Sequence, residues 1–256
     1  MDGARPRIIH LGETGSTNAD AMRLALNGEE LPLWVIADRQ TAGRGRAGRT
    51  WTSPKGNLYA SLAFCCAASL EKAAQLSLIA GISLFEAILT TTHLAQAPGL
   101  RLKWPNDILM GTAKMGGILV ESTTARGSPG FVATIGFGLN LASAPGDLGR
   151  AATALSEHTT APTPDRLLTE LAAEVSRWLA IWQDGRNFAA IGKAWTDRSG
   201  PIGEAISVNT ADGPVSGTYQ GLSESGALLA VIDGSVREIT HGDVLLAGAA
   251  GHDGGK

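Results

Sequence analysis

Three arginines lie within a short glycine-rich segment, which carries the strongest chemical signal in the sequence. Residues 43–48 read Gly-Arg-Gly-Arg-Ala-Gly, and Arg49 and Trp51 come next. Glycine lets a ligand approach the backbone closely, and guanidinium groups donate paired hydrogen bonds to phosphates and carboxylates. The indole of Trp51 could stack on a nucleobase. The segment therefore predicts an anion-binding loop, with a solvated basic loop as the alternative.

Residues 43–48 also satisfy the G-x-G-x-x-G pattern of dinucleotide-binding folds, but the residues that follow do not fit such a site. In those folds a helix begins directly after the glycines, because its amino terminus holds the pyrophosphate. Here the chain continues through Pro54, Gly56 and Asn57, which cannot form that helix. The context therefore excludes a Rossmann-type site.

A second cluster of chemically useful residues, Lys103-Trp104-Pro105-Asn106-Asp107, begins at the end of a predicted strand. In isolation, Asn106 and Asp107 are best explained as residues of a turn set by the proline. Lys114 lies just before two glycines and an apolar strand, which is an unusual place for a solvated charge. Its ammonium could neutralise charge on a phosphate or carboxylate in a transition state. Asn140, after a later strand, offers an amide that can pair with an adenine edge.

We expect an α+β fold with a mixed sheet to position these residues, because strand-like and helix-like segments do not alternate strictly. The predicted strands are residues 8–11, 33–37, 57–64, 100–104, 108–110, 117–121 and 131–137. The predicted helices are residues 17–27, opened by a capping box at 17–20, then 71–89 and 162–182.

The pattern of the sequence changes beyond Gly200, where short strand-like runs predict a small all-β domain. The runs are residues 205–209, 215–220, 227–232 and 235–240, with hairpin signals at Asp212-Gly213 and Asp233-Gly234. We therefore divide the chain into a catalytic domain over residues 1–198, a small domain over 199–248 and a disordered tail over 249–256.

Composition sets the wider limits. The 256 residues carry a net charge of -3, with 44% hydrophobic and 18% charged residues, which excludes a generally basic nucleic-acid binder. Residues 1–7 lack the apolar core of a signal peptide, and the apolar run 76–89 is too short to span a bilayer. Cys65 and Cys66 are adjacent, so they cannot join distant segments, and we expect two small buried residues at a strand end. A reducing cytoplasm fits best.

Taken together, these motifs resemble those of the biotin protein ligases, also called biotin–[acetyl-CoA-carboxylase] ligases. The motifs occur in the family's order: Ser16-Thr17-Asn18, Gln40, Gly43 to Arg49 with Trp51, Ser53-Pro54, Lys103 to Asp107, Lys114 to Glu121, and Gly136-x-Gly138-x-Asn140. The resemblance covers residues 8–142 strongly and the carboxy-terminal segment weakly, through 226–229 and 242–244. It implies a class II synthetase-like ligase core followed by an SH3-like β-barrel.

Three further expectations follow from the resemblance. Some family members carry an amino-terminal DNA-binding domain, but only about fifteen residues precede Ser16, so that form is not expected. Gly116 replaces an alanine common in the family, and Leu139-Asn140-Leu141 replaces the usual Ile-Asn-Met. We expect both departures to leave the chemistry unchanged.

The resemblance also implies roles for individual positions. Biotin would be bound by Ser16, Thr17, Asn18, Gln40, Arg44, Gly45, Arg46, Lys114 and Gly136. ATP would be bound by Arg46, Arg49, Trp51, Lys114 and Asn140, with the tryptophan and the asparagine near the adenine. Arg46 and Lys114 would be the catalytic groups, the lysine stabilising the pentavalent α-phosphorus. Asn106 and Asp107 would support the site or accompany Mg²⁺.

The implied reaction has two steps. Biotin and MgATP would give biotinyl-5′-adenylate and pyrophosphate, with the glycine-rich loop folding over the adenylate to exclude water. A lysine of a biotin carboxyl carrier protein, in acetyl-CoA carboxylase or another biotin-dependent carboxylase, would then attack. The enzyme would act in the cytoplasm as a monomer or homodimer, without nucleic acid or membrane.

Two alternatives remain from the sequence. A lipoate–protein ligase shares the fold and the adenylate chemistry, but residues 43–49 and 103–107 are typical of the biotin branch. A biotin sensor that has lost ligation is the non-enzymatic alternative. It is disfavoured because a sensor could dispense with Arg46 and Lys114.

Overall fold

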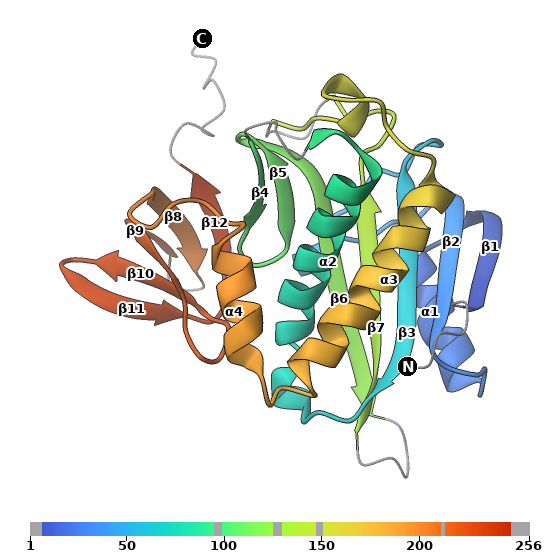
Figure 1. The fold of residues 1–256 in the computed structure, drawn as a ribbon, viewed down its shortest axis with the longest axis horizontal. Helices are drawn as coiled ribbons and strands as arrows, with labels where there is room; N and C mark the ends of the chain where they lie inside the picture. The colour runs from blue at the N-terminus through green and yellow to red at the C-terminus, as the bar shows by residue number, and fades with distance from the viewer. Residues whose placement is uncertain (1–6, 95–98, 125–129, 147–150, 211–212, 247–256) are drawn as a thin grey trace.

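The computed structural model describes residues 7–94, 99–124, 130–146, 151–210 and 213–246 (Figure 1). Its centre is a seven-stranded mixed sheet with, in spatial order, β1 (Arg7–Thr14), β2 (Leu33–Gln40), β3 (Leu58–Cys66), β7 (Phe131–Leu139), β6 (Ala113–Thr124), β5 (Asp107–Met110) and β4 (Leu100–Lys103). Only β1 and β2 run parallel, and the other neighbours are antiparallel. The α-helices are α1 (Thr17–Leu26), α2 (Gln75–Thr91), α3 (Pro164–Trp182) and α4 (Phe188–Thr196). These elements confirm the predicted α+β class.

The two faces of the sheet are covered unequally. Side chains alternate along a strand, so Phe137 and Gly136 of β7 point to opposite faces. Phe137 belongs to the main core, together with buried residues of α2 and α3, and Figure 1 shows these two helices side by side across the front of the sheet. Gly136 lies against Asn18 of α1. Helix α1 packs on β2, β3 and β7, so β6 and the end of β7 are left for loops to cover.

Helix α2 is the most apolar element. Together with the preceding 3₁₀ turn it spans Leu70–Thr91, which is 22 residues. By length and composition alone such a helix could cross a membrane, so the apolar segment is longer than the predicted run 76–89. However, 67% of its apolar window is buried inside the fold, as in the core helix of a globular protein. Gly81 allows close packing here, because a Cβ atom at this position would lie 2.6 Å from Cζ3 of Trp195.

The carboxy-terminal part contains a second sheet of five antiparallel strands. In spatial order these are β11 (Ser235–Ile239), β10 (Leu228–Ile232), β9 (Gly213–Leu222), β8 (Ala205–Thr210) and β12 (Asp243–Leu246). The hairpin at Asp233-Gly234 is confirmed, with φ angles of 51° and 76°, whereas Asp212 and the tail lie outside the described residues. Among the described residues β11 and β12 do not pair, so the five strands of the predicted SH3-like part form a separate antiparallel sheet that is not closed by strand pairing.

The two sheets share contacts across their boundary. Arg101 donates to Glu204 over 2.7 Å, and Lys103 Nζ donates to the carbonyl of Val244 over 2.9 Å. Buried residues of the second sheet, such as Tyr219 and Leu228, belong to the same contiguous core as helix α2. The small sheet is therefore packed against the large one as part of a single interior.

Two local predictions are wrong. Helix α1 has Ser16 as its N-cap and shows no side-chain capping bond, so the capping box at residues 17–20 does not form. Thr17 and Asn18 instead bond to Gln40 and Glu121, outside the helix. Cys66 is buried, as expected, but Cys65 is exposed.

Candidate active site

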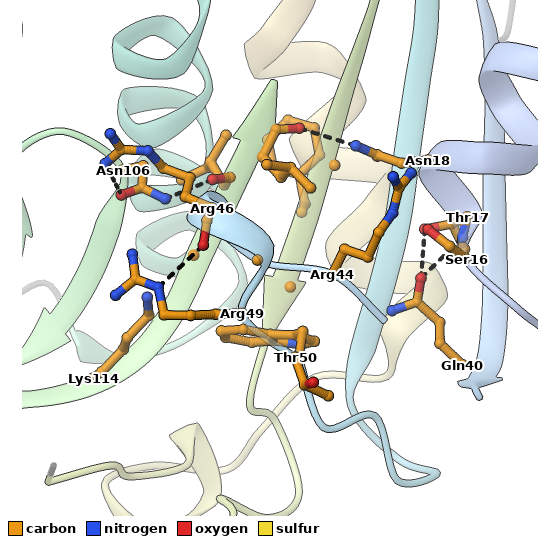
Figure 2. Close-up of a pocket in the computed structure, with 18 residues that line it drawn as sticks. Ser16, Thr17, Asn18, Gln40, Arg44, Arg46, Arg49, Thr50, Asn106 and Lys114 are labelled. Atoms are coloured by element: carbon orange, nitrogen blue, oxygen red, sulfur yellow. Dashed lines mark hydrogen bonds between the residues drawn. The ribbon is translucent and has the colours of Figure 1, made fainter. Parts of the chain in front are cut away.

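A cavity of about 620 Å³, counted with its open mouth, lies on the same face of the sheet as α1, over the part that this helix leaves uncovered. The predicted residues that line it are Ser16, Thr17, Asn18, Gln40, Arg44, Gly45, Arg46, Arg49, Trp51, Asn106, Lys114 and Gly136. Thr50, Gly117, Ile118, Leu119, Phe137 and Gly138 complete the lining. Figure 2 shows the polar side chains converging on this space from α1, from the glycine-rich loop of residues 41–51 (the arginine loop) and from β6.

One end of the cavity is a neutral polar network at the start of α1. The backbone N–H of Thr17 donates to Oε1 of Gln40 over 2.9 Å, and its hydroxyl donates to the same oxygen over 3.1 Å. Nε2 of Gln40 donates to Oγ of Ser53 over 3.0 Å. Ser61, which is fully buried on β3, places its hydroxyl 2.8 Å from that of Thr17. These contacts fix donors and acceptors in place before any ligand arrives, which suits recognition of an uncharged polar group.

Asn18 connects this network to the arginine loop. Its Nδ2 donates to the carbonyl of Leu119 over 3.2 Å and to Oε2 of Glu121 over 2.8 Å. Glu121 also forms an ion pair of 3.2 Å with Arg44. Gly136 is required for this arrangement, because a Cβ atom there would lie 2.3 Å from Oδ1 of Asn18.

The arginine loop, residues 41–51, is folded on itself. The N–H of Gly45 donates to the carbonyl of Arg49 over 2.6 Å, and the N–H of Trp51 donates to the carbonyl of Gly43 over 2.9 Å. Gly43 permits this turn, because a Cβ atom there would lie 2.4 Å from the Trp51 carbonyl oxygen. Arg46 donates to Oδ1 of Asn106 over 3.3 Å. The loop therefore covers the cavity with its guanidinium groups held by polar partners.

A carboxylate from the second sheet also holds this loop. Asp243 of β12 forms an ion pair of 2.9 Å with Arg49 and one of 3.6 Å with Arg46. Both arginines and the aspartate are partly exposed, so each pair is weak by itself. Their joint effect is to bring the start of β12 against the arginine loop.

A β-bulge places Lys114 in the cavity. Ile108 of β5 pairs with Gly116 whereas Leu109 pairs with Lys114, so Met115 has no partner of its own. The extra residue changes the alternation of side chains. As a result Lys114 and Gly117, three positions apart, both line the cavity, while Met115 is buried in the core. Strand β6 begins at Ala113, before the lysine. The prediction that this strand begins after the lysine, at residue 117, is therefore wrong.

Asp107 holds Lys114 from the side away from the main cavity. Its Oδ1 accepts from Lys114, its Oδ2 forms an ion pair of 3.0 Å with Lys103, and the residue is only 5% exposed. Burial raises the pKa of this carboxyl, but the two ammonium groups outweigh it and hold the pKa below its ordinary value. Asp107 is therefore ionised and orients the lysine.

The same contacts argue against Asp107 as a Mg²⁺ ligand, contrary to the expectation from the resemblance. Both carboxylate oxygens already face ammonium groups, and a divalent cation beside two lysines would be repelled. Asn106 donates to the carbonyl of Ile118 over 2.7 Å and accepts from Arg46. Within the part of the chain that is described, no three His, Cys, Asp or Glu side chains are grouped to hold a metal ion.

Trp51 separates the main cavity from a smaller one. A Cβ atom on Gly138 would lie 2.6 Å from Cε2 of Trp51, so only glycine lets the indole lie this close to β7. Nζ of Lys114 lies 5.5 Å from the ring centroid, within reach of a cation–π interaction. The smaller cavity, about 330 Å³, lies beyond the indole, and its lining includes Asn140 and Pro145. Asn140 therefore does not line the main cavity, although it lies next to it.

Several residues that shape the site were not predicted. Glu121 ends the motif that starts at Lys114, and Asp243 lies in residues 242–244, but nothing local indicates that they pair with loop arginines. Ser61 and Asn57 resemble ordinary polar residues in or beside a strand. For Ser61, the one available signal was a hydroxyl in the otherwise apolar run Leu58–Phe64.

Comparisons with known proteins agree with this architecture. Residues 13–140 match the model of the biotin/lipoate A/B protein ligase family, and residues 202–246 match that of the biotin protein ligase C terminal domain. The biotin–[acetyl-CoA-carboxylase] ligase of Paracoccus denitrificans is 40% identical over 230 residues, which cover 86% of this chain and 92% of the relative.

Two solved structures share the fold. The biotin protein ligase from Aquifex aeolicus, in complex with biotin and ATP, is 28% identical and superposes with a TM-score of 0.76, covering 94% of this chain and 98% of that one. The biotin protein ligase from Leishmania major, in complex with biotinyl-5-AMP, is 27% identical with a TM-score of 0.65, covering 93% and 100%. The chain therefore belongs to the biotin/lipoate A/B protein ligase family, as one of its biotin protein ligases.

Proposed function

We propose that the chain is an ATP-dependent biotin ligase, which forms biotinyl-5′-adenylate and transfers the biotinyl group to a lysine of a biotin carboxyl carrier domain. The observation that carries this proposal is one cavity with two chemically distinct parts. A neutral polar network lies at one end, and Arg44, Arg46, Arg49 and Lys114 line the rest. The ligands of the two solved relatives, biotin with ATP and biotinyl-5-AMP, have the same division into a neutral ring and an anionic part.

In this proposal the neutral network binds the ureido ring of biotin. Ser16, Thr17 and Gln40 offer hydroxyl and amide groups already fixed by hydrogen bonds, so little side-chain freedom is lost on binding. Asn18 and Gly136 form the adjoining wall. The orientation of the ring would direct the valeryl carboxylate toward the arginine loop.

The positions of Arg46 and Lys114 in the cavity support an adenylation step. The biotin carboxylate oxygen attacks the α-phosphorus of ATP, a bond to that phosphorus forms, and the bond to the β-phosphate oxygen breaks to release pyrophosphate. Arg46 and Lys114 would lie beside the reacting groups and stabilise the negative charge on the α-phosphate oxygens as it develops. Asp107 keeps Lys114 in place through an ion pair, so the ammonium needs no reorganisation during the step.

Transfer needs no nucleophile from the enzyme. The ε-amine of the acceptor lysine attacks the acyl carbon of the adenylate, the carbon–oxygen bond to AMP breaks, and the amine loses a proton to solvent. The arginine loop covers the mixed anhydride and excludes water until the acceptor arrives. Mg²⁺, when bound to ATP, would neutralise part of the triphosphate charge, and we assign it no protein ligand.

Pyrophosphate exchange tests the first half-reaction. With ³²P-pyrophosphate and ATP, we expect label to enter ATP only when biotin is present. Exchange with lipoate and not biotin would establish the lipoate ligase alternative, and no exchange with either would reject adenylate chemistry altogether. A non-catalytic sensor would bind biotin without exchange.

The role of Lys114 is tested in the same assay. Lys114→Ala should lower exchange by about 100-fold or more, because a fixed cation at a developing charge is lost. Lys193→Ala is the matched control, because this lysine is 77% exposed and forms an ion pair with Asp197 on the surface. Near-normal exchange by Lys114→Ala would remove the lysine from its proposed role.

The acceptor and the setting complete the proposal. The acceptor would be the biotin carboxyl carrier domain of acetyl-CoA carboxylase or another biotin-dependent carboxylase, and the enzyme would act in the cytoplasm as a monomer or homodimer, without nucleic acid or membrane. We place the domain boundary at residues 198–199. Biotin transfer to a purified carrier domain, with size-exclusion chromatography of the enzyme, tests the acceptor and the assembly.

A further inference from the structure

Asn57 makes an unusually complete set of contacts directly before β3. Its Oδ1 accepts hydrogen bonds from three consecutive backbone N–H groups, those of Leu141 at 2.9 Å, Ala142 at 2.9 Å and Ser143 at 3.2 Å. Its Nδ2 donates to the carbonyl of Ser143 over 2.8 Å. The side chain is 1% exposed, so these groups have no water to replace the bonds. One carboxamide therefore fixes the chain immediately after β7.

The segment that Asn57 holds begins next to Asn140. The N–H of Asn140 donates to the Met115 carbonyl over 2.9 Å, and its Nδ2 donates to the Thr153 carbonyl over 3.1 Å. Residues 151–153 are in turn bonded to Lys114, whose backbone N–H donates to Ala151 over 2.9 Å and whose carbonyl accepts from Thr153 over 3.0 Å. Residues 140–143 and 151–153 are thus held in place around the smaller cavity beyond Trp51.

Asn57 touches neither cavity directly. The smaller cavity is lined by Thr50, Trp51, Thr52, Lys114, Asn140, Pro145 and Ala152. Two of its walls, Asn140 and Pro145, lie on either side of residues 141–143, which Asn57 binds. The hydrogen bonds described above do not join residues 141–143 to the main-cavity walls at α1 and β6. Thr50, Trp51 and Lys114 line both cavities. Loss of the asparagine would therefore distort the side of the smaller cavity formed by Asn140 and Pro145 and leave the neutral network at α1 in place.

We propose that Asn57 is a positioning residue for the nucleotide: by fixing residues 141–143 it holds Asn140 and the wall of the smaller cavity where the adenine of ATP binds. This rests on the proposed function, because it takes the cavity beyond Trp51 as the adenine end of the site. Gly56 agrees with such a close approach, because its φ is +95° and a Cβ atom there would lie 3.0 Å from Cβ of Ala142.

Asn57→Ala tests this with a comparison of the two substrates. We expect the Kd for ATP, by titration calorimetry without biotin, and the KM for ATP in pyrophosphate exchange to rise about tenfold. The Kd for biotin alone should stay within about twofold of that of the unaltered protein. Asn187→Ala is the matched control, because Nδ2 of Asn187 also anchors a backbone carbonyl, that of Ile181 over 3.0 Å, but at the distant α3–α4 turn. It should lower stability without changing either affinity.

Asn57→Asp gives a graded check that also serves if the alanine variant does not fold. The aspartate keeps an acceptor for the three N–H groups but faces the Ser143 carbonyl with an oxygen, so ATP affinity should fall only about threefold. Equal losses of ATP and biotin affinity, or unchanged ATP affinity in a variant that melts at a lower temperature, would overturn the proposal. If the unaltered protein shows no biotin-dependent exchange, the proposed function fails, whereas the calorimetric ATP arm still decides the role of Asn57.

Discussion

Gly136→Ala should damage the biotin end of the site by steric overlap alone. The added methyl group would lie 2.3 Å from Oδ1 of Asn18, whereas ordinary contact begins near 3.4 Å, so the carboxamide must move by about 1 Å. Such a movement cannot keep both of its hydrogen bonds, at 3.2 Å to Leu119 and 2.8 Å to Glu121. Overpacking a close-packed position costs about 1–3 kcal/mol, and one lost buried hydrogen bond adds about 1 kcal/mol.

A total near 3 kcal/mol corresponds to a Tm lower by roughly 6–12 °C for a chain of this size. Biotin affinity should fall about tenfold, because Asn18 forms part of the wall of the cavity. Differential scanning calorimetry and biotin titration calorimetry measure the two effects.

Gly12→Ala provides the control for this prediction. Gly12 lies on β1, and a Cβ atom there meets nothing within 4 Å. Alanine should leave biotin binding unchanged and raise Tm slightly, because it restricts the unfolded chain. Gly136→Ala with unaltered Tm and biotin affinity, or the same losses in Gly12→Ala, would refute the steric argument.

Three further substitutions test other parts of the site. Asp107→Asn should lower stability at neutral pH, because the folded-state pKa of this carboxyl lies below its ordinary 3.8, so its stabilising effect is present above 3.8 and is lost as the pH falls through the folded-state value. Urea midpoints between pH 3 and pH 7 should therefore vary less with pH in the variant, and an unchanged pH profile would contradict the Asp107–Lys114 pair. Gly138→Ala should displace Trp51 and raise the KM for ATP about tenfold while biotin affinity changes little, measured by exchange kinetics and calorimetry. Glu121→Gln should release the first arginine of the loop and speed proteolysis of residues 41–51, and equal cleavage rates would show that the ion pair does not hold the loop.

The polar residues of the site could be predicted because they interrupt apolar or glycine-rich contexts. Lys114 before two glycines and the arginines among glycines have no simple structural explanation, and the cavity contains both. The resemblance placed Thr17 and Asn18 in the site, whereas their local sequence predicted a helix capping box that does not form. Their side chains are equally suited to cap a helix and to line a binding site. Local propensity could not decide between the two uses.

Other features depend on partners that are distant in sequence. The bulge at Met115 depends on the register of β5 against β6, which the sequence of neither strand specifies. The pairing of Arg49 with Asp243 joins positions 194 residues apart, and each residue looks like an ordinary surface charge. Helix α4 has nine residues, fewer than the roughly 11 over which helical periodicity is normally recognised, so it was not predicted.

The continuous interior of the two sheets has a consequence for unfolding. Trp195 is fully buried, lines a cavity with Tyr219 and Leu228 of the second sheet, and lies against Gly81 of α2. Detaching the second sheet would expose this tryptophan and the apolar surface around it to water. Melting should therefore be one cooperative transition in calorimetry, with equal calorimetric and van't Hoff enthalpies. A chain cut after residue 198 should aggregate, since the catalytic part depends on its small neighbour to complete its own interior.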